Sequence, residues 1–162
     1  MNDMPDYISN MPENVNTNIL NRLPLKEAVT TSSLATNWRY KWTLLTDVIL
    51  DEDFFYFLTN KVEGMHVTRL LLQLKGPIRR FVFSVELKPL SGQDYFNYEE
   101  IHAWLLLLGQ RGIEELLIHN WSVKPVILPT QMYTRLELKH LELHWCTLCG
   151  KLEGGLNSFT SF

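Results

Sequence analysis

Residues 11–25 read MPENVNTNILNRLPL, and two prolines in this stretch mark where a helix begins and where it ends. Pro12 and Glu13 suit the first turn of a helix, with Asn10 as its N-cap. Apolar side chains then recur along one helix face, at Val15, Ile19, Leu20 and Leu23. Pro24 disfavours helical geometry at the residue before it. The spacing therefore predicts a helix that starts near Met11 and stops before Pro24.

A second short helix is predicted at about residues 26–34, followed by the aromatic and basic segment 37–42 with sequence NWRYKW. Two short helices separated by a Leu-Pro break cannot bury their apolar faces by themselves. They need either a further domain or a second chain as a cover. From the spacing alone, an ordinary helical start to a single core is the favoured explanation.

Taken together, these residues resemble an F-box, in particular that of the plant F-box/FBD/leucine-rich-repeat proteins. The similarity runs from about residue 5 to residue 45 and includes both prolines and the closing Trp38-Arg39. The resemblance implies a helical module that docks on a Skp-type adaptor of a cullin-RING ubiquitin ligase. The adaptor-facing residues that it implies are Met11, Pro12, Val15, Ile19, Leu20, Leu23 and Pro24.

The segment Asn16-Thr17-Asn18 departs from the pattern of that family, which tends to carry an apolar residue and better helix formers there. Asn and Thr side chains compete for backbone hydrogen bonds inside a helix, which costs about 1–2 kcal/mol over three residues. Loss of one apolar adaptor contact at position 16 costs a similar amount, about 1–2 kcal/mol. We therefore expect adaptor binding that is weak but detectable.

The chain beyond residue 46 alternates between strand-like and helix-like segments. Strand patterns occur from Asp47 and over 78–85, 113–118 and 138–148, and helical patterns occur over 54–75 and 98–109. Residues 138–148 fit L-x-x-L-x-L-x-x-C-x-L at every position, which is typical of leucine-rich repeats. In this strand, Leu141 and Leu143 point into the stack, and the intervening residues lie on an open face.

We therefore predict an α+β fold with a helical F-box at 5–45 and a short, incomplete leucine-rich-repeat α/β solenoid at 46–162. The last residues show no polar end cap of the kind that solenoids need, so the chain looks truncated. On the open face, the residues predicted to bind a partner are Arg80, Glu115, His119, Lys139, Glu142 and His144.

Composition restricts the class of partner and the compartment. The 162 residues carry a formal charge of −3, which provides no basic field for nucleic acid. The N-terminus lacks a signal-peptide pattern, no apolar run is long enough to span a membrane, and two cysteines make no disulfide framework. We expect an intracellular protein, in nucleus or cytoplasm, that binds neither nucleic acid nor membrane and needs no cofactor.

Four groups of residues could suggest metal binding, catalysis or nucleic-acid binding. His140, His144, Cys146 and Cys149 include a Cys-x-x-Cys zinc half-site, but the repeat pattern already accounts for Cys146. The acidic run 51–53 does not match a calcium loop, and the acidic pairs 99–100 and 114–115 accompany no nucleophile motif. The segment 37–42 lacks the wider basic groove that nucleic-acid binding requires.

The function that these features favour is the substrate-recognition subunit of an SCF-type (Skp-cullin-F-box) ubiquitin ligase. The F-box would bind the adaptor, and through it the cullin, while the repeats would hold an unidentified target protein. Such a subunit is not itself an enzyme, because it acts by raising the effective concentration of the target near the ubiquitin-carrying enzyme. The alternative is a truncated adaptor-binding protein without ligase function, either a competitor or a nonfunctional fragment.

Overall fold

The computed structural model describes residues 11–33, 36–57, 64–85, 98–121, 125–129, 138–148 and 159–161. The N-terminal part is helical, with α1 at Glu13–Leu20 and α2 at Leu25–Thr30. Three 3₁₀ turns follow, η1 at Thr31–Ser33, η2 at Thr36–Trp38 and η3 at Lys41–Leu44. Both predicted helices are therefore present but shorter than expected. A tight turn already follows Leu20, and α2 ends at Thr30, where η1 begins.

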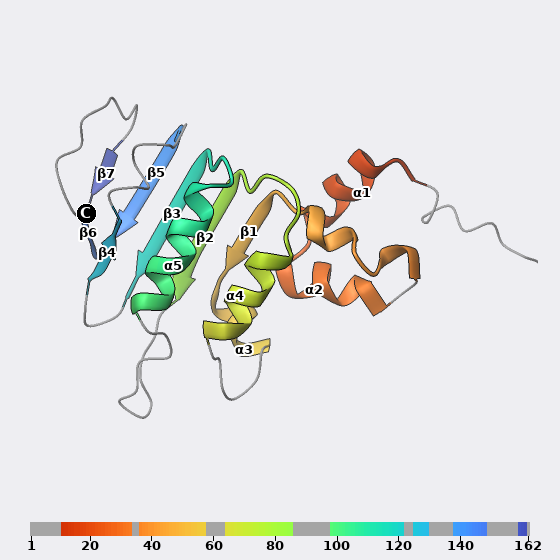
Figure 1. Ribbon diagram of the computed structural model, residues 1–162, viewed down its shortest axis with the longest axis horizontal. Coiled ribbons are helices and arrows are strands. Elements are labelled where there is room, and N and C mark those ends of the chain that lie inside the picture. The colour runs from red at the N-terminus through yellow and green to blue at the C-terminus, as the bar shows by residue number, and fades with distance from the viewer. Residues whose placement is uncertain are drawn as a thin grey trace, which may run out of the picture.

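The main element after the N-terminal part is a five-stranded parallel sheet. Its strands lie side by side in the order in which they occur in the chain (Figure 1). Its strands are β1 (Asp47–Leu50), β2 (Arg80–Val85), β3 (Glu115–Asn120), β5 (His140–His144) and β7 (Phe159–Ser161). A second, two-stranded parallel sheet joins β4 (Val126–Leu128) to β6 (Cys146–Leu148). The strand-like stretch at 138–148 is therefore divided between the two sheets.

Helices cover one face of the main sheet, as Figure 1 shows. They are α3 (Glu52–Phe57), α4 (Gly64–Gln73) and α5 (Tyr98–Gly109). The prediction of a helix over 98–109 is confirmed. Of the stretch 54–75, also predicted to be helical, the structure describes α3, which contacts α2 and β1, and α4, which packs on α5, while residues 58–63 lie outside the described residues. Among the described segments, no helix combines the length and apolar character needed to cross a bilayer.

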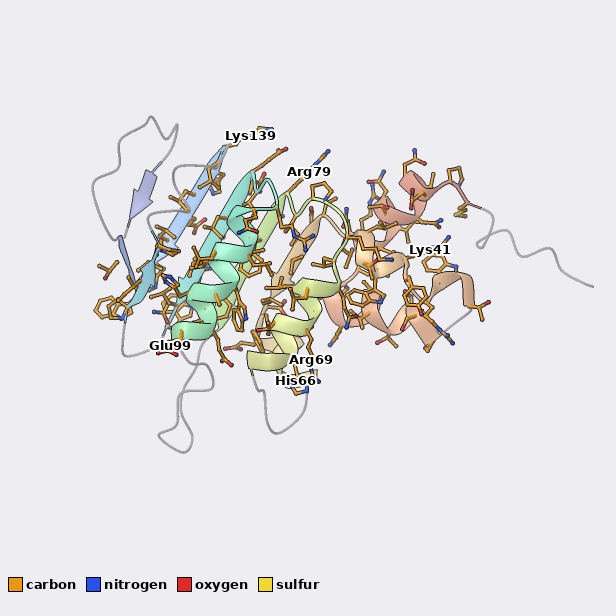
Figure 2. The ribbon with its side chains drawn as sticks, in the orientation of Figure 1. Lys41, His66, Arg69, Arg79, Glu99 and Lys139 are labelled. Carbon is orange, nitrogen blue, oxygen red and sulfur yellow. The ribbon has the colours of Figure 1, made fainter. Side chains whose placement is uncertain are left out.

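Each of the strands β2, β3 and β5 begins with the same backbone hydrogen-bond pattern. One carbonyl just ahead of a strand accepts hydrogen bonds from two successive N–H groups at the start of the next strand. The accepting carbonyls belong to Thr46, Arg79 and Glu114, and the donor pairs are 79–80, 114–115 and 139–140, at 2.7–3.1 Å. This repetition aligns the strands in register, so that Arg79 and Lys139 lie at the same end of the sheet (Figure 2).

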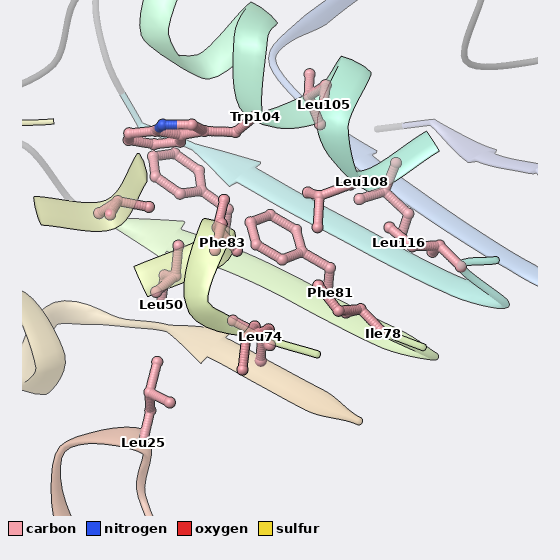
Figure 3. Packing of buried hydrophobic residues seen from close by; sticks show 14 of the residues in the cluster. Leu25, Leu50, Leu74, Ile78, Phe81, Phe83, Trp104, Leu105, Leu108 and Leu116 are labelled. Carbon is pink, nitrogen blue, oxygen red and sulfur yellow. The ribbon is translucent and has the colours of Figure 1, made fainter. Parts of the chain in front are cut away.

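The core lies between the sheet and its helices (Figure 3). Phe81, Phe83 and Leu116 point from the sheet toward Trp104 and Leu108 of α5. The Trp104 ring lies 6.2 Å from that of Phe83 and also donates a hydrogen bond to Thr68 Oγ1 at 2.8 Å, which ties α5 to α4. The same apolar cluster continues into the N-terminal helices through Leu20, Leu25, Ala28, Trp38 and Trp42. The helical module and the sheet therefore share one core.

Asn16 is an exception inside this core, because it is a buried polar residue with half of its amide unsatisfied. Its Nδ2 donates a hydrogen bond to the Met11 carbonyl at 2.9 Å, but its Oδ1 has no partner. A buried acceptor without a partner costs about 1–3 kcal/mol of stability. Asn16 therefore lowers the stability of α1 from the inside.

We predict that Asn16→Leu stabilises the protein by about 1–2 kcal/mol, because it removes the unsatisfied oxygen and adds a better helix former of similar shape. Chemical denaturation monitored by circular dichroism measures the free energy of unfolding. The control is Asn18→Leu, at an exposed position of the same helix, where the gain in helix propensity alone gives about 0.5 kcal/mol. A loss of stability in Asn16→Leu would show that the polar amide is required.

Candidate functional site

The first candidate surface is the outer side of α1, where apolar side chains face solvent. Val15 and Ile19 are each 39% exposed, and they lie one turn apart on the same helix face. Pro12 and Pro24 are also exposed, and Met11 and Leu23 are half-buried. We define these six residues as the apolar ridge. Exposed apolar side chains one turn apart make this ridge a candidate surface for contact with another protein.

Leu20 does not belong to this surface, although the sequence analysis placed it there. It is fully buried in the shared core, on the side of α1 that packs against η3. A helix turns by about 100° per residue, so Ile19 and Leu20 leave it in different directions. The apolar face of α1 is therefore divided, with Leu20 covered by its own chain and Ile19 left open.

The role assigned to Asn16 also changes, because its side chain faces the interior and offers no contact to an adaptor. Its polarity acts on the stability of α1 instead. Thr17 and Asn18 lie on a further side of the helix and line a polar groove of about 740 Å³. The opposite wall of this groove is formed by residues 76, 77 and 79 ahead of β2.

The end of α1 is tied to the start of the sheet by a reciprocal pair of hydrogen bonds. Asn21 Nδ2 donates to Thr46 Oγ1 at 2.8 Å, and the Thr46 backbone N–H donates to Asn21 Oδ1 at 3.2 Å. The Thr46 hydroxyl in turn donates to the Asp47 carboxylate at 3.0 Å. This pair fixes the apolar ridge relative to the sheet.

The second candidate surface is the face of the sheet opposite α4 and α5. Strand residues alternate between the core and this open face, as the burial patterns of β1, β3 and β5 show. In-register pairing brings the open-face residues of successive strands into rows. Of the predicted partner-binding residues, the structure places on this face Arg80, Glu115, His119, Glu142 and His144. Lys139 lies just before β5, at the same end as Arg79.

Several of these charged residues pair with neighbours within the chain. Arg80 Nε lies 3.4 Å from the Glu115 carboxylate, and Lys139 Nζ lies 2.7 Å from that of Glu114. The hydrogen bond from Lys139 lowers the pKa of Glu114, so this carboxylate stays ionised at neutral pH. These pairs join neighbouring strands, and their charges are already compensated before any partner arrives.

Glu142 has a different environment, because both side chains that contact it in the described part of the chain are histidines. Its Oε1 lies 2.9 Å from His119 Nε2, and its Oε2 lies 3.7 Å from His140 Nε2. The hydrogen bond from His119 lowers the pKa of Glu142. Next to this group, the ring of His144 stacks at 4.2 Å on the exposed Trp121, while its Nδ1 lies 3.2 Å from the Asn120 carbonyl oxygen.

The zinc interpretation finds no support where the structure describes its residues. Burial raises the pKa of the Cys146 thiol to about 12, and its Sγ donates to the His144 carbonyl at 3.4 Å. Within the described ranges, no three His, Cys, Asp or Glu side chains come together as a metal site. Cys149 lies outside those ranges.

The exposure of Trp121 and Trp145 and the apolar residues of the open face were not predicted from the sequence. Trp121 and Trp145 directly follow β3 and β5, and both are more than half exposed. Trp145 has φ 53°, and its carbonyl accepts hydrogen bonds from Asn120 Nδ2 and the Val126 N–H. A tryptophan directly after β3 and another directly after β5 are a signal that could have been read from the sequence.

The structure thus offers two surfaces of the kind at which one protein can bind another, an apolar helical ridge and an open face of a parallel sheet. Comparison with known families shows what the chain resembles. Residues 8–47 match the model of the F-box domain. The N-terminal part of the chain thus matches an F-box, and the chain is similar to plant F-box/FBD/LRR-repeat proteins.

Curated relatives from Arabidopsis thaliana cover most of this chain. An F-box/FBD/LRR-repeat protein is 35% identical over 153 residues, which is 90% of this chain and 34% of the relative. A second protein of that description is 32% identical over 148 residues, and an F-box/LRR-repeat protein is 29% identical over 144 residues. They are covered to 32% and 29% of their lengths, so the chain spans about a third of these relatives. No solved structure matches the chain significantly.

We predict that Asn21→Ala destabilises the protein by about 1–3 kcal/mol, because Thr46 loses both partners. Combined with Thr46→Val in a double-mutant cycle, the coupling energy should be about 1–2 kcal/mol. Denaturant unfolding of the four proteins measures it. Asn18→Ala, at an exposed position without such a pair, serves as the control. Because Thr46→Val keeps the backbone N–H, the cycle measures the hydrogen bond from Asn21 Nδ2 to the Thr46 hydroxyl, and additive effects of the two substitutions would mean that this bond does not couple the helix to the sheet.

Proposed function

We propose that this chain is the substrate-recognition subunit of an SCF-type ubiquitin ligase. Its F-box would bind a Skp-type adaptor, and through it the cullin, while the open face of the sheet would bind the target protein. The observation that carries the proposal is the apolar ridge, which lies inside the stretch that matches the F-box model and remains exposed in the free chain.

The residues proposed to contact the adaptor are those of the apolar ridge, namely Met11, Pro12, Val15, Ile19, Leu23 and Pro24. Covering a side chain such as Val15 or Ile19 gains about 1 kcal/mol or more for each residue. Leu20 supports this surface from below, since it anchors α1 to the core. Because Asn16 points inward, it does not weaken the contact directly.

We further propose that the sheet region from residue 46 onward is the beginning of a leucine-rich-repeat solenoid. The repeated carbonyl pattern at Thr46, Arg79 and Glu114 supports this interpretation. So does the stacking of α4 on α5. Each strand-helix unit buries its apolar side against the next, which is how solenoids are stabilised.

Under this proposal, the chain contributes binding and position, not bond-making. The ligase would hold a bound target close to the ubiquitin-carrying enzyme, so that a bimolecular reaction gains a high effective concentration. No residue of this chain is assigned a step in ubiquitin transfer, and no cofactor is invoked. The compartment proposed is the nucleus or the cytoplasm, where such ligases meet their targets.

Co-expression with a Skp-type adaptor, followed by size-exclusion chromatography, tests the adaptor contact. We expect a complex whose affinity falls about 10- to 100-fold in Val15→Asp or Ile19→Asp, because each places a charge in an apolar contact. Ile127→Asp changes a still more exposed apolar residue on β4 and should bind like the unaltered chain. Absence of any complex with the unaltered chain would refute the proposed function.

Leu20→Ala separates support from contact. We expect it to lower the free energy of unfolding by about 2–5 kcal/mol, as for other fully buried leucines. Val15→Ala should lower that free energy by less than about 1 kcal/mol, since Val15 is partly exposed already. Thermal and denaturant unfolding measure both. Equal losses in the two variants would mean that the ridge also forms part of the core.

The alternative of a competitor is decided in the same system. Reconstitution with adaptor and cullin, followed by mass spectrometry of proteins that require the sheet face, should identify a third protein. A complex with adaptor and cullin that captures no further protein would favour the alternative.

A further inference from the structure

An apolar stripe crosses the open face of the main sheet. It consists of Ile49 on β1, Val82 on β2 and Leu117 on β3, which are direct partners in the register of the sheet. Ile49 is 36% exposed, and the other two are half-buried. The next residue in this row, on β5, is Glu142, and its register partner on β7 is Thr160. From β1 to β5 the row therefore reads apolar, apolar, apolar, acidic.

The spacing of the stripe selects the shape of what can lie on it. Neighbouring strands are about 4.8 Å apart, so the stripe presents a contact at that interval along a line across the strands. Successive turns of an α-helix place side chains of one face at intervals of about 5.4 Å. An extended chain places side chains of one face about 6.6 Å apart, which loses step with the stripe within two contacts. A helix lying across the strands therefore fits the row best.

The charge that follows the apolar stripe on β5 selects the chemistry of that helix. The Glu142 side chain is 41% exposed, and a carboxylate has about four acceptor sites, of which His119 and His140 occupy at most two. The neighbouring cations are engaged elsewhere, since Arg80 pairs with Glu115 and Lys139 with Glu114. Glu142 thus retains acceptor capacity and negative charge for an incoming Lys or Arg.

We propose that the open face receives an amphipathic α-helix of the target, laid across β1, β2, β3 and β5. Its apolar side chains, about one per turn, rest on Ile49, Val82 and Leu117, and a Lys or Arg one turn further on binds Glu142. This inference deepens the proposed function, on which it rests for the statement that the bound protein is a target.

A display selection tests this inference without knowledge of the target. The probe is a phage-displayed library of randomised single-helix peptides, selected on the full chain and counter-selected on its Ile49→Gln variant. We expect enriched peptides with apolar residues at helical spacing, followed after one turn by Lys or Arg. Synthetic peptides from the selection should bind Ile49→Gln about 10-fold more weakly and Glu142→Gln about 5-fold more weakly.

Ile127→Gln provides the matched control, because it makes the same substitution at an apolar strand residue that is 53% exposed but lies in the other sheet. It should bind the selected peptides unchanged. Thermal unfolding of all variants checks that they fold. Enriched peptides that are acidic at the terminal position, that are extended, or that depend on Trp121 in place of Ile49 would overturn the inference. So would a selection without enrichment.

The failure of this inference can be told apart from the failure of the proposed function. The apolar ridge of α1 lies on a different element from the stripe, so Ile49→Gln should retain the adaptor. Adaptor binding together with a failed helix selection removes the inference and leaves the proposed function standing. A successful selection without adaptor binding identifies a helix-binding face on a protein outside the ligase.

Discussion

Thr46 is the residue on which the arrangement of this protein depends, because each of its polar groups joins two parts of the fold. Its N–H and its hydroxyl bind the side chain of Asn21 at the end of α1. Its carbonyl accepts the hydrogen bonds of Arg79 and Arg80 that start β2. A single residue thus links the F-box helix to the first two strands. Since these groups are partly buried, leaving any of them unpaired is costly, and this cost holds the two surfaces in one orientation.

The same carbonyl pattern, repeated from strand to strand, also determines what the open face can offer. In-register parallel strands turn the period-two alternation of each strand into straight rows of like position. One row contains the apolar stripe followed by Glu142, and a neighbouring row contains the Arg80–Glu115 pair. Charges that pair along a row contribute little to binding, since exposed ion pairs are worth at most about 1 kcal/mol. Under the proposed function, partners are therefore distinguished by the row of Ile49, Val82, Leu117 and Glu142, whose residues do not form ion pairs with one another.

Much of this organisation could be predicted from the sequence, because strand alternation and helix periodicity depend on local patterns. Helix α5 has the predicted bounds, and the core-facing Leu141 and Leu143 are buried as expected. Periodicity did not decide between adjacent residues, so Leu20 was placed with Ile19 although they point in different directions. The start of α3 at Glu52 was missed because Asp51, interpreted as part of a solvated turn, accepts a hydrogen bond from the Phe54 N–H at 2.9 Å and so caps the helix. The rows of the open face depend on register, which no single strand contains.

The position of Asn16 directly beneath the apolar ridge gives the free F-box a particular energetic character. The helix that would carry the adaptor contact is the same helix that buries an unsatisfied amide oxygen, so the ridge is supported by a weakened element. A partner that binds only the folded helix stabilises it by RT ln(1 + [L]/Kd). At a concentration of 100 Kd this amounts to about 2.7 kcal/mol, which is comparable to the cost of about 1–3 kcal/mol at Asn16. Under the proposed function, the adaptor therefore compensates for a polar defect that it never touches, and α1 reaches its full stability only in the assembled ligase.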